Sequence, residues 1–251
     1  MCGRFVSARQ RQELIDEFLI ETDHVAGDVA ADYNVAPTDS IYAVLTRAGE
    51  GDRTQAGDRP TRQLRRVRWG LVPSWAKDPS AGSRMINARA ETVTAKPSFR
   101  AAFARRRCLI PADGYYEWRA LGGGSRPPKQ PYYIHPADGR GMAFAGLYEL
   151  WRDRTLPADH PKSWLWTAVI ITTQATDDLG RIHDRMPMVV GPDRWAEWLD
   201  PAASDPRVLL DAMVPAVSSG LATRPVSTAV NSVRNDGPDL IAPVAPAPGD
   251  A

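Results

Sequence analysis

The chain has 251 residues, of which 43% are hydrophobic and 24% charged, with a formal net charge of +1 at pH 7. This is an ordinary globular composition without an apolar stretch long enough to span a membrane, and the small net charge gives no sign of a duplex-binding protein. We expect one domain over residues 1–242 and a disordered Pro- and Ala-rich tail over residues 243–251.

The first predicted element is a helix over residues 7–20, SARQRQELIDEFLI, where apolar side chains recur at helical spacing and Ser7 is a suitable N-cap. A short strand, IYAVLT, follows at residues 41–46. Residues 47–63 are rich in Gly and charge and are expected to form a solvated loop or hairpin insertion. The stretch 64–75, LRRVRWGLVPSW, begins as a strand and ends in a loop.

From residue 98 onward, most of the predicted elements are β-strands. Residues 98–107 predict a helix with Ser98 as a possible cap, and residues 192–200, PDRWAEWLD, predict a short helix that begins at a proline. Five strand candidates lie between them: 107–112, 114–120, 131–136, 142–151 and 164–173. Many strands with a few peripheral helices indicate an α+β fold, mostly β, with a curved sheet or a partly closed barrel.

The chain opens with MCGRF, which places a cysteine directly after the initiator methionine. If Met1 is removed, Cys2 carries both a thiol and a free α-amine, whose ordinary pKa values are about 8.5 and roughly 7.7–8.0. Both groups are then partly deprotonated near neutral pH, which makes Cys2 a candidate nucleophile. A chance cysteine in a frayed end is the plainer alternative. Cys108 and Trp69 lie in strand-like runs and are expected in the core.

Glu117 and His183 lie in unusual surroundings. In GYYEW, Glu117 shares a strand face with Tyr115, so burial is expected to raise its pKa toward a value suited to acid–base work. A cross-strand ion pair with an arginine is the structural alternative. In RIHDRMP, arginines flank His183 and are expected to lower its pKa; a loop histidine bonded to Asp184 or backbone is the alternative. The four histidines show no metal-ligand spacing, so neither a metal nor a cofactor is expected.

Arg4, Arg89 and Arg185 each lie beside a stretch that holds a candidate reactive residue. A guanidinium in such a place suits a phosphate or a carboxylate. Pro73 and Trp75 are expected to be exposed, and aromatic rings that stack on bases often accompany phosphate-binding arginines in proteins that bind single strands. A core position for Trp75 is the alternative.

Six motifs occur together and in order: MCGRF, YNVAPT, WGLVPSW, INARAET, GYYEW and IHDRMPMVV. In these motifs the chain resembles the SOS-response-associated peptidase (SRAP) family, which senses abasic sites in single-stranded DNA. The resemblance runs from Met1 to the stretch VSTAVNSVRNDGPDLIAP, and residues 47–63 and 152–162 look like local insertions.

The resemblance implies an SRAP-like fold and assigns roles to particular residues. Its catalytic set comprises Cys2, Asn87, Glu117 and His183. It also implies a DNA-binding set, to which we add Arg4 because it lies close to Cys2: Arg4, Pro37, Trp75, Arg89 and Arg185. Within that set, the loops around Pro37 and Trp75 would wedge between stacked bases.

The chemistry that the resemblance implies requires a thiol and a free α-amine on the same residue, which Cys2 would supply. An abasic deoxyribose opens to an aldehyde, the Cys2 amine forms a Schiff base with it, and the thiolate closes a thiazolidine ring. Well-oriented intramolecular steps of this kind reach effective molarities of about 10⁵–10⁸ M. The product is a covalent DNA–protein crosslink that would shield the lesion during the DNA damage response. His183 would assist ring opening, Glu117 would shuttle protons, and Asn87 would orient the amine or a sugar hydroxyl.

Two other functions remain open from the residues themselves. Glutamine amidotransferases also begin with MCG, so an N-terminal-nucleophile amidohydrolase is one alternative; a non-catalytic single-strand-binding module is the other. The family name further implies a peptidase activity, such as release of Met1 in cis. The expected partner is single-stranded DNA with abasic sites. The protein is expected to be a cytoplasmic monomer that associates with the nucleoid when it is bound to DNA.

Overall fold

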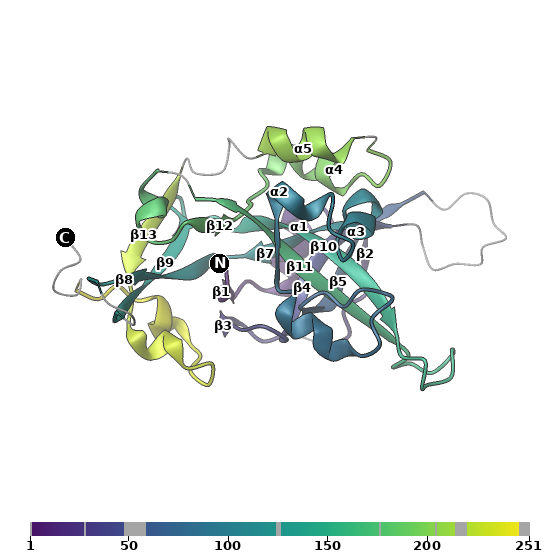
Figure 1. Ribbon diagram of the computed structural model, residues 1–251, viewed down its shortest axis with the longest axis horizontal. Helices are drawn as coiled ribbons and strands as arrows, with labels where there is room; N and C mark the ends of the chain where they lie inside the picture. The colour runs from purple at the N-terminus through teal and green to yellow at the C-terminus, as the bar shows by residue number, and fades with distance from the viewer. Residues whose placement is uncertain are drawn as a thin grey trace.

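The structure is a computed structural model that describes residues 2–27, 29–47, 59–123, 127–175, 177–203, 205–213 and 220–245. Over these residues the fold is mostly β, with short helices on the outside (Figure 1). The predicted fold class is therefore confirmed. No helix within the described ranges is long and apolar enough to cross a bilayer.

Five strands form a closed barrel: β4 (Ser40–Arg47), β5 (Thr61–Trp69), β7 (Arg107–Ala112), β10 (Met142–Arg152) and β11 (Trp164–Gln174). They pair antiparallel in the order β11–β10–β7–β4–β5. The ring closes where β5 pairs parallel with β11, with Arg68 opposite Thr167 and Trp69 opposite Ala168. Three short strands extend this sheet at its edges: β2 (Thr22–Asp23), β6 (Asn87–Arg89) and β12 (Arg185–Pro187).

A second, five-stranded antiparallel sheet adjoins the barrel. Its order is β13 (Leu221–Pro225), β9 (Lys129–Pro136), β8 (Gly114–Ala120), β1 (Phe5–Ser7) and β3 (Asp32–Val35). Asp113 alone separates β7 of the barrel from β8 of this sheet, and its carboxylate accepts a hydrogen bond from the Ala8 backbone at 2.6 Å. The N-terminal strand is thereby fixed where the two sheets meet.

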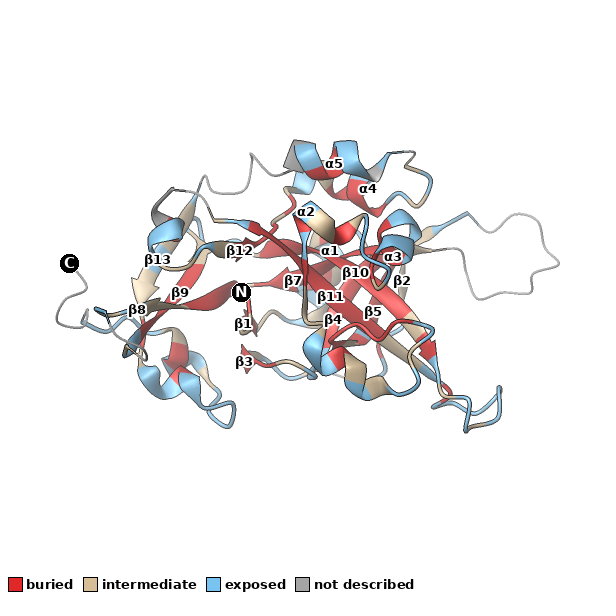
Figure 2. Cartoon of the chain, in the orientation of Figure 1, coloured by how far each residue is buried: buried red, intermediate tan, exposed pale blue. Residues whose placement is uncertain are grey.

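Buried residues concentrate on the barrel strands (Figure 2), and alternation along these strands divides them between two apolar cores. One face carries Ala43, Val67, Cys108 and Ile170 and lines the barrel. The other face packs against the helices α1 (Arg11–Glu17), α2 (Ala90–Val93), α3 (Arg100–Arg105), α4 (Trp195–Leu199) and α5 (Pro206–Met213). Five 3₁₀ turns complete the described elements: η1 (Pro79–Arg84), η2 (Asp177–Arg181), η3 (Pro192–Arg194), η5 (Thr228–Asn231) and η6 (Pro238–Ile241). Trp69 and Cys108 are fully buried, as predicted.

Both predicted serine caps are wrong. Ser7 is the last residue of β1, where it pairs with Asp32 of β3, so its backbone is committed to a sheet and α1 begins only after Gln10. At α3 the residue before the helix is Phe99, and no side chain caps that end. Cap preference is a local signal, and long-range strand pairing overrides it at Ser7.

The two expected irregular segments fall partly outside the described residues. Most of the insertion predicted at 47–63 lies there, since β4 ends at Arg47 and β5 begins at Thr61. Of the expected tail, Pro243 forms a bridge with Val226 and the Val244 backbone donates to the Pro225 carbonyl at 3.0 Å. Residues 246–251 are outside the described part.

Gly70 is the residue at which β5 leaves the barrel, and its backbone requires glycine. Its φ is +122°, and a Cβ there would lie 2.5 Å from the Gly82 carbonyl oxygen. We expect Gly70→Ala to lower the free energy of unfolding by about 2–4 kcal/mol, because strain and overpacking add. Gly139→Ala is the matched control, since Gly139 also has a positive φ of +73° but nothing within 4 Å. Urea unfolding of both variants tests this; equal losses would contradict it.

Candidate functional site

Cys2 lies in the barrel core where the two sheets meet, in the same cluster as Phe5, Trp69 and Phe144. It is 0% exposed, so the alternative of a frayed end is wrong. Burial raises the pKa of the Cys2 thiol well above its usual range, and the nearby Glu117 carboxylate raises it further. The thiol is therefore protonated in this state.

Asn87 holds the backbone of Cys2. Its Nδ2 donates a hydrogen bond to the Cys2 carbonyl oxygen at 2.7 Å. The short strand β6 places it there by pairing parallel with β11, with Asn87 opposite Ile170. The Asn87 Oδ1 is buried and has no hydrogen-bond partner among the described residues. One acceptor therefore remains available beside the reactive end of the chain.

Glu117 lies on β8 and is only 3% exposed. Burial raises its pKa to about 7, as the aromatic strand predicts, while the positive amino terminus opposes the rise. Tyr115, two residues earlier, lies opposite Phe5 in the sheet, and its buried hydroxyl has no partner within the described residues. Burial raises the pKa of Tyr115, and the charges of Cys2 and Glu117 add to this. Sequence reasoning left Tyr115 out of the site, although its place on the Glu117 face was the signal.

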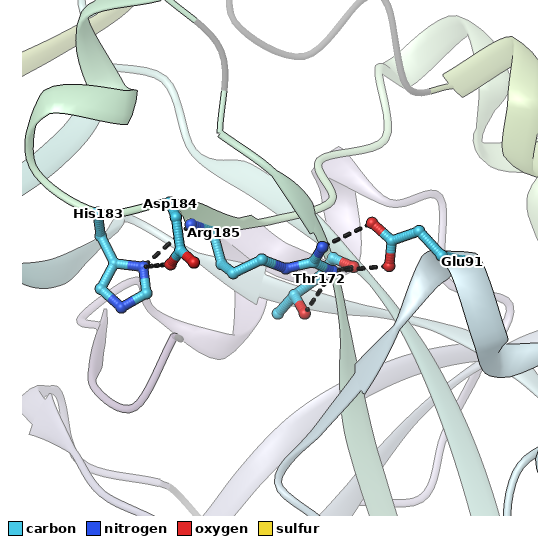
Figure 3. A network of polar contacts seen from close by, with 5 residues as sticks. All are labelled: Glu91, Thr172, His183, Asp184 and Arg185. Carbon is cyan, nitrogen blue, oxygen red and sulfur yellow. Dashed lines mark hydrogen bonds and ion pairs between the residues drawn. The ribbon is translucent and has the colours of Figure 1, made fainter.

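His183 is half-buried, and its ring makes local polar contacts (Figure 3). Its Nδ1 accepts from the Arg185 backbone N–H at 3.0 Å and lies 2.8 Å from Asp184 Oδ1. A neutral ring accepting at Nδ1 carries its proton on Nε2, whereas a protonated ring would donate to Asp184. The predicted fall in the His183 pKa is confirmed, but its causes are burial and the amino terminus rather than the flanking arginines.

The Arg185 guanidinium turns away from His183 toward α2 (Figure 3). It forms a two-pronged ion pair with Glu91, at 2.6 and 3.0 Å, and donates to the Thr172 carbonyl at 2.6 Å. The hydrogen bond from Arg185 lowers the pKa of Glu91. Arg89 differs: it is exposed, lies opposite Thr172 in the β6–β11 pairing, and has no polar partner among the described residues.

The remaining residues of the predicted DNA-binding set lie in different surroundings. Arg4 donates to Asn34 Oδ1 at 2.7 Å and to the Val230 carbonyl at 2.9 Å, so it fastens the N-terminal strand to distant loops. Pro37 is half-buried, and Trp75 is 65% exposed, as predicted. Pro73 is buried, against expectation, because the loop packs it inward.

The structure thus brings Cys2 close to Asn87 and Glu117, with a thiol, an amide and a carboxyl group that titrates near neutrality. No group of three or more His, Cys, Asp or Glu side chains that could hold a metal occurs within the described ranges.

The family model for SOS response associated peptidase (SRAP) matches residues 1–233. The chain belongs to the SRAP family. Among SRAP relatives, abasic site processing protein YoaM of Bacillus subtilis is 38% identical over 96% of this chain and 97% of its own length. Abasic site processing protein YedK of Escherichia coli is 30% identical over 97% of this chain and 100% of its own length. Abasic site processing protein HMCES of Gallus gallus is 37% identical over 84% of this chain and 66% of its own.

The fold is shared with solved structures as well. A crystal structure of a Bacteroides thetaiotaomicron protein superposes with a TM-score of 0.75 at 22% identity, covering 97% of this chain and 100% of that one. The SRAP fold expected from the motifs is therefore confirmed.

Glu117 should make the stability of this SRAP chain fall as the pH rises. Because folding raises its pKa to about 7, the folded state is favoured while the carboxyl is protonated and loses that advantage as the pH rises through 7. Relative to Glu117→Gln, we expect the unfolding free energy of the wild type to fall by about 2–3 kcal/mol from about pH 5 to pH 8. Urea unfolding at both pH values measures this. Glu13→Gln, which changes an exposed carboxyl on α1, is the control; the same pH dependence in wild type and Glu117→Gln would contradict the assignment.

Proposed function

We propose that this chain senses abasic sites in single-stranded DNA and captures them covalently through Cys2 once Met1 has been removed. Membership of the SRAP family and the relatives named as abasic site processing proteins support abasic-site processing. The observation that carries the covalent step is the position of Cys2, buried and held through its carbonyl by Asn87, with its thiol electrostatically coupled to Glu117. The peptidase activity in the family name would be the release of Met1 that exposes the amine.

The chemistry begins with the ring-opened sugar. The Cys2 amine adds to the aldehyde carbon, and the resulting carbinolamine loses its hydroxyl as water to give an iminium ion. The Cys2 sulfur then adds to the same carbon, which breaks the C=N π bond and leaves a ring nitrogen bearing one hydrogen. One aldehyde and one aminothiol become one thiazolidine and one water. The second bond forms within the first adduct, which favours closure strongly.

Glu117 is suited to both proton transfers in this sequence. With Met1 in place its pKa is about 7, so protonated and ionised forms coexist near neutral pH. The protonated form would give its proton to the departing hydroxyl, and the carboxylate would then take the thiol proton as sulfur adds. His183 would give the Nε2 proton to the ring oxygen as the sugar opens. Asn87 would accept a hydrogen bond from the amine through its open Oδ1.

The test of this function is a crosslink that survives denaturation. Wild-type protein incubated with single-stranded DNA carrying an abasic site should run as a heat-stable adduct on a denaturing gel. We expect Cys2→Ala to abolish it and Cys2→Ser to leave at most an imine that borohydride traps, because an oxygen-containing ring is more labile. Cys108→Ala removes the other, fully buried cysteine and is the matched control. Full crosslinking by Cys2→Ala would refute the thiazolidine, and an intact duplex preferred over single strands would refute the substrate.

Glu117 and His183 should change the rate of this reaction without supplying the bond. We expect folded Glu117→Gln and His183→Ala each to slow single-turnover crosslinking by about 10²–10⁴-fold, the usual contribution of a general acid or base. In Glu117→Gln the dependence of the rate on a group of pKa about 7 should disappear. The measurement is the crosslinking rate across pH, with folding checked by circular dichroism. Wild-type rates in both variants would make these residues structural.

A further inference from the structure

The β10–β11 hairpin projects beyond the barrel (Figure 1, lower right). Its strands stay paired up to Arg152 and Trp164, which lie opposite each other. Beyond them the Asp153 backbone donates to the Ser163 carbonyl at 2.8 Å, and Asp153 Oδ1 accepts from the Thr155 hydroxyl at 2.6 Å. The tip, which looks like an insertion in the sequence, is therefore a turn held by its own hydrogen bonds.

A pocket of about 500 Å³ opens at the base of this turn, and we call it the hairpin pocket. It is lined by Ser74, Leu150, Arg152, Arg154 and Trp164. Its size lies in the usual range of ligand sites, and its lining combines an aromatic ring with two guanidinium groups.

The hairpin pocket adjoins the loop that carries Trp75. Ser74 lines the pocket directly before Trp75, and Trp151 Nε1 donates to the Ala76 carbonyl at 2.8 Å, which ties the loop to the hairpin. Trp75 is 65% and Trp164 49% exposed. These are the two large aromatic side chains that stand exposed within the described ranges; Trp164 lines the pocket, and Trp75 follows the lining residue Ser74 in the chain.

The charges of the pocket are unbalanced. Arg152 and Arg154 are exposed and have no ion-pair partner among the described residues. Asp153 stands between them in the chain and stays ionised, because the Thr155 hydrogen bonds lower its pKa, but it does not line the pocket. Positive charge therefore stands beside an open tryptophan face.

Trp166, two residues further along β11, shows which groups pack on an indole face in this region. Trp166 has the Arg65 guanidinium 4.2 Å from its ring centre and Arg47 at 5.2 Å, and its ring stacks on Tyr148 at 5.6 Å. Its stacking partners come from the protein itself. Trp164 has no such ring or guanidinium contact among the described residues, so its face is free for a ligand.

We propose that the hairpin pocket is a subsite for single-stranded nucleic acid, in which a base stacks on Trp164 and phosphates pair with Arg152 and Arg154. The pairing of aromatic faces with basic side chains is the chemistry by which proteins hold single strands. This inference rests on the proposed function and extends its DNA path. Trp164 and Thr172, which faces Arg89, are eight residues apart on β11, which corresponds to about 25 Å. The subsite therefore holds nucleotides remote from the lesion.

The test uses lesion-free strands, which cannot form the crosslink. Fluorescence anisotropy gives the Kd of wild type and Trp164→Ala for an oligothymidylate of about 20 nucleotides and for one of about 4. We expect Trp164→Ala to raise the Kd for the long strand about 5- to 100-fold and to leave the short strand, which need not reach the pocket, unchanged. Trp164→Phe should restore much of the affinity, since it keeps an aromatic face.

Arg152→Gln/Arg154→Gln tests the phosphate contacts. We expect the salt slope of log K for the long strand to fall in magnitude by about 1.4, or about 0.7 for each phosphate lost. Arg100→Gln/Arg105→Gln removes the same charge from exposed positions on α3 and should leave the slope nearly unchanged.

Three results would overturn the subsite. The first is wild-type affinity of Trp164→Ala for the long strand, and the second is an equal fall of the salt slope in both arginine double variants. The third is an equal loss of affinity for intact duplex, which would make the pocket a duplex contact. A wild type that fails to crosslink would refute the proposed function alone, because these binding measurements do not depend on it.

Discussion

The parallel pairing of β5 with β11 is the constraint on which the site depends. It closes the barrel, and the chain that leaves it stays attached to the same strand. Gly70 donates to the Ala168 carbonyl at 2.8 Å, and the Val72 backbone donates to the Thr167 hydroxyl at 3.0 Å. After the Trp75 loop the chain returns as β6 and pairs with β11 again, further along. One strand thus sets the spacing between the exposed tryptophan and the residues around Cys2.

Burial gives the reactive groups a common property. It raises the pKa of Cys2 and of Glu117 and lowers that of His183, so in each case the uncharged form is favoured. In the proposed reaction, each group would therefore begin uncharged and would carry a charge only during its own proton transfer.

The sequence predicted what alternation and local chemistry determine. The strands at 107–112 and 114–120 have the predicted bounds, and the aromatic strand correctly indicated the raised pKa of Glu117. It could not predict contacts made by residues distant in the chain. Arg4 binds Asn34 and the loop near Val230, and Arg185 binds Glu91, 94 positions away. Asn34 and Glu91 lie in the motifs YNVAPT and INARAET, but nothing in the sequence pairs either residue with a distant arginine, so both arginines read as free cations. The parallel pairing of β6 with β11 could not be predicted from the sequence for the same reason.

Arg89 and Arg185 hold matching places in their motifs but differ in electrostatic state. Arg185 forms a direct ion pair with Glu91, whereas Arg89 forms no salt bridge among the described residues and acts on Glu91 only through its charge, which helps to lower the Glu91 pKa. A phosphate arriving at Arg89 would form a new ion pair. At Arg185 it would exchange with Glu91, one anion for another, and the displaced carboxylate would have to be solvated again. Arg185 would therefore favour a well-oriented phosphate rather than supply bulk attraction. Glu91 would serve as a built-in competitor that sets the threshold for occupancy.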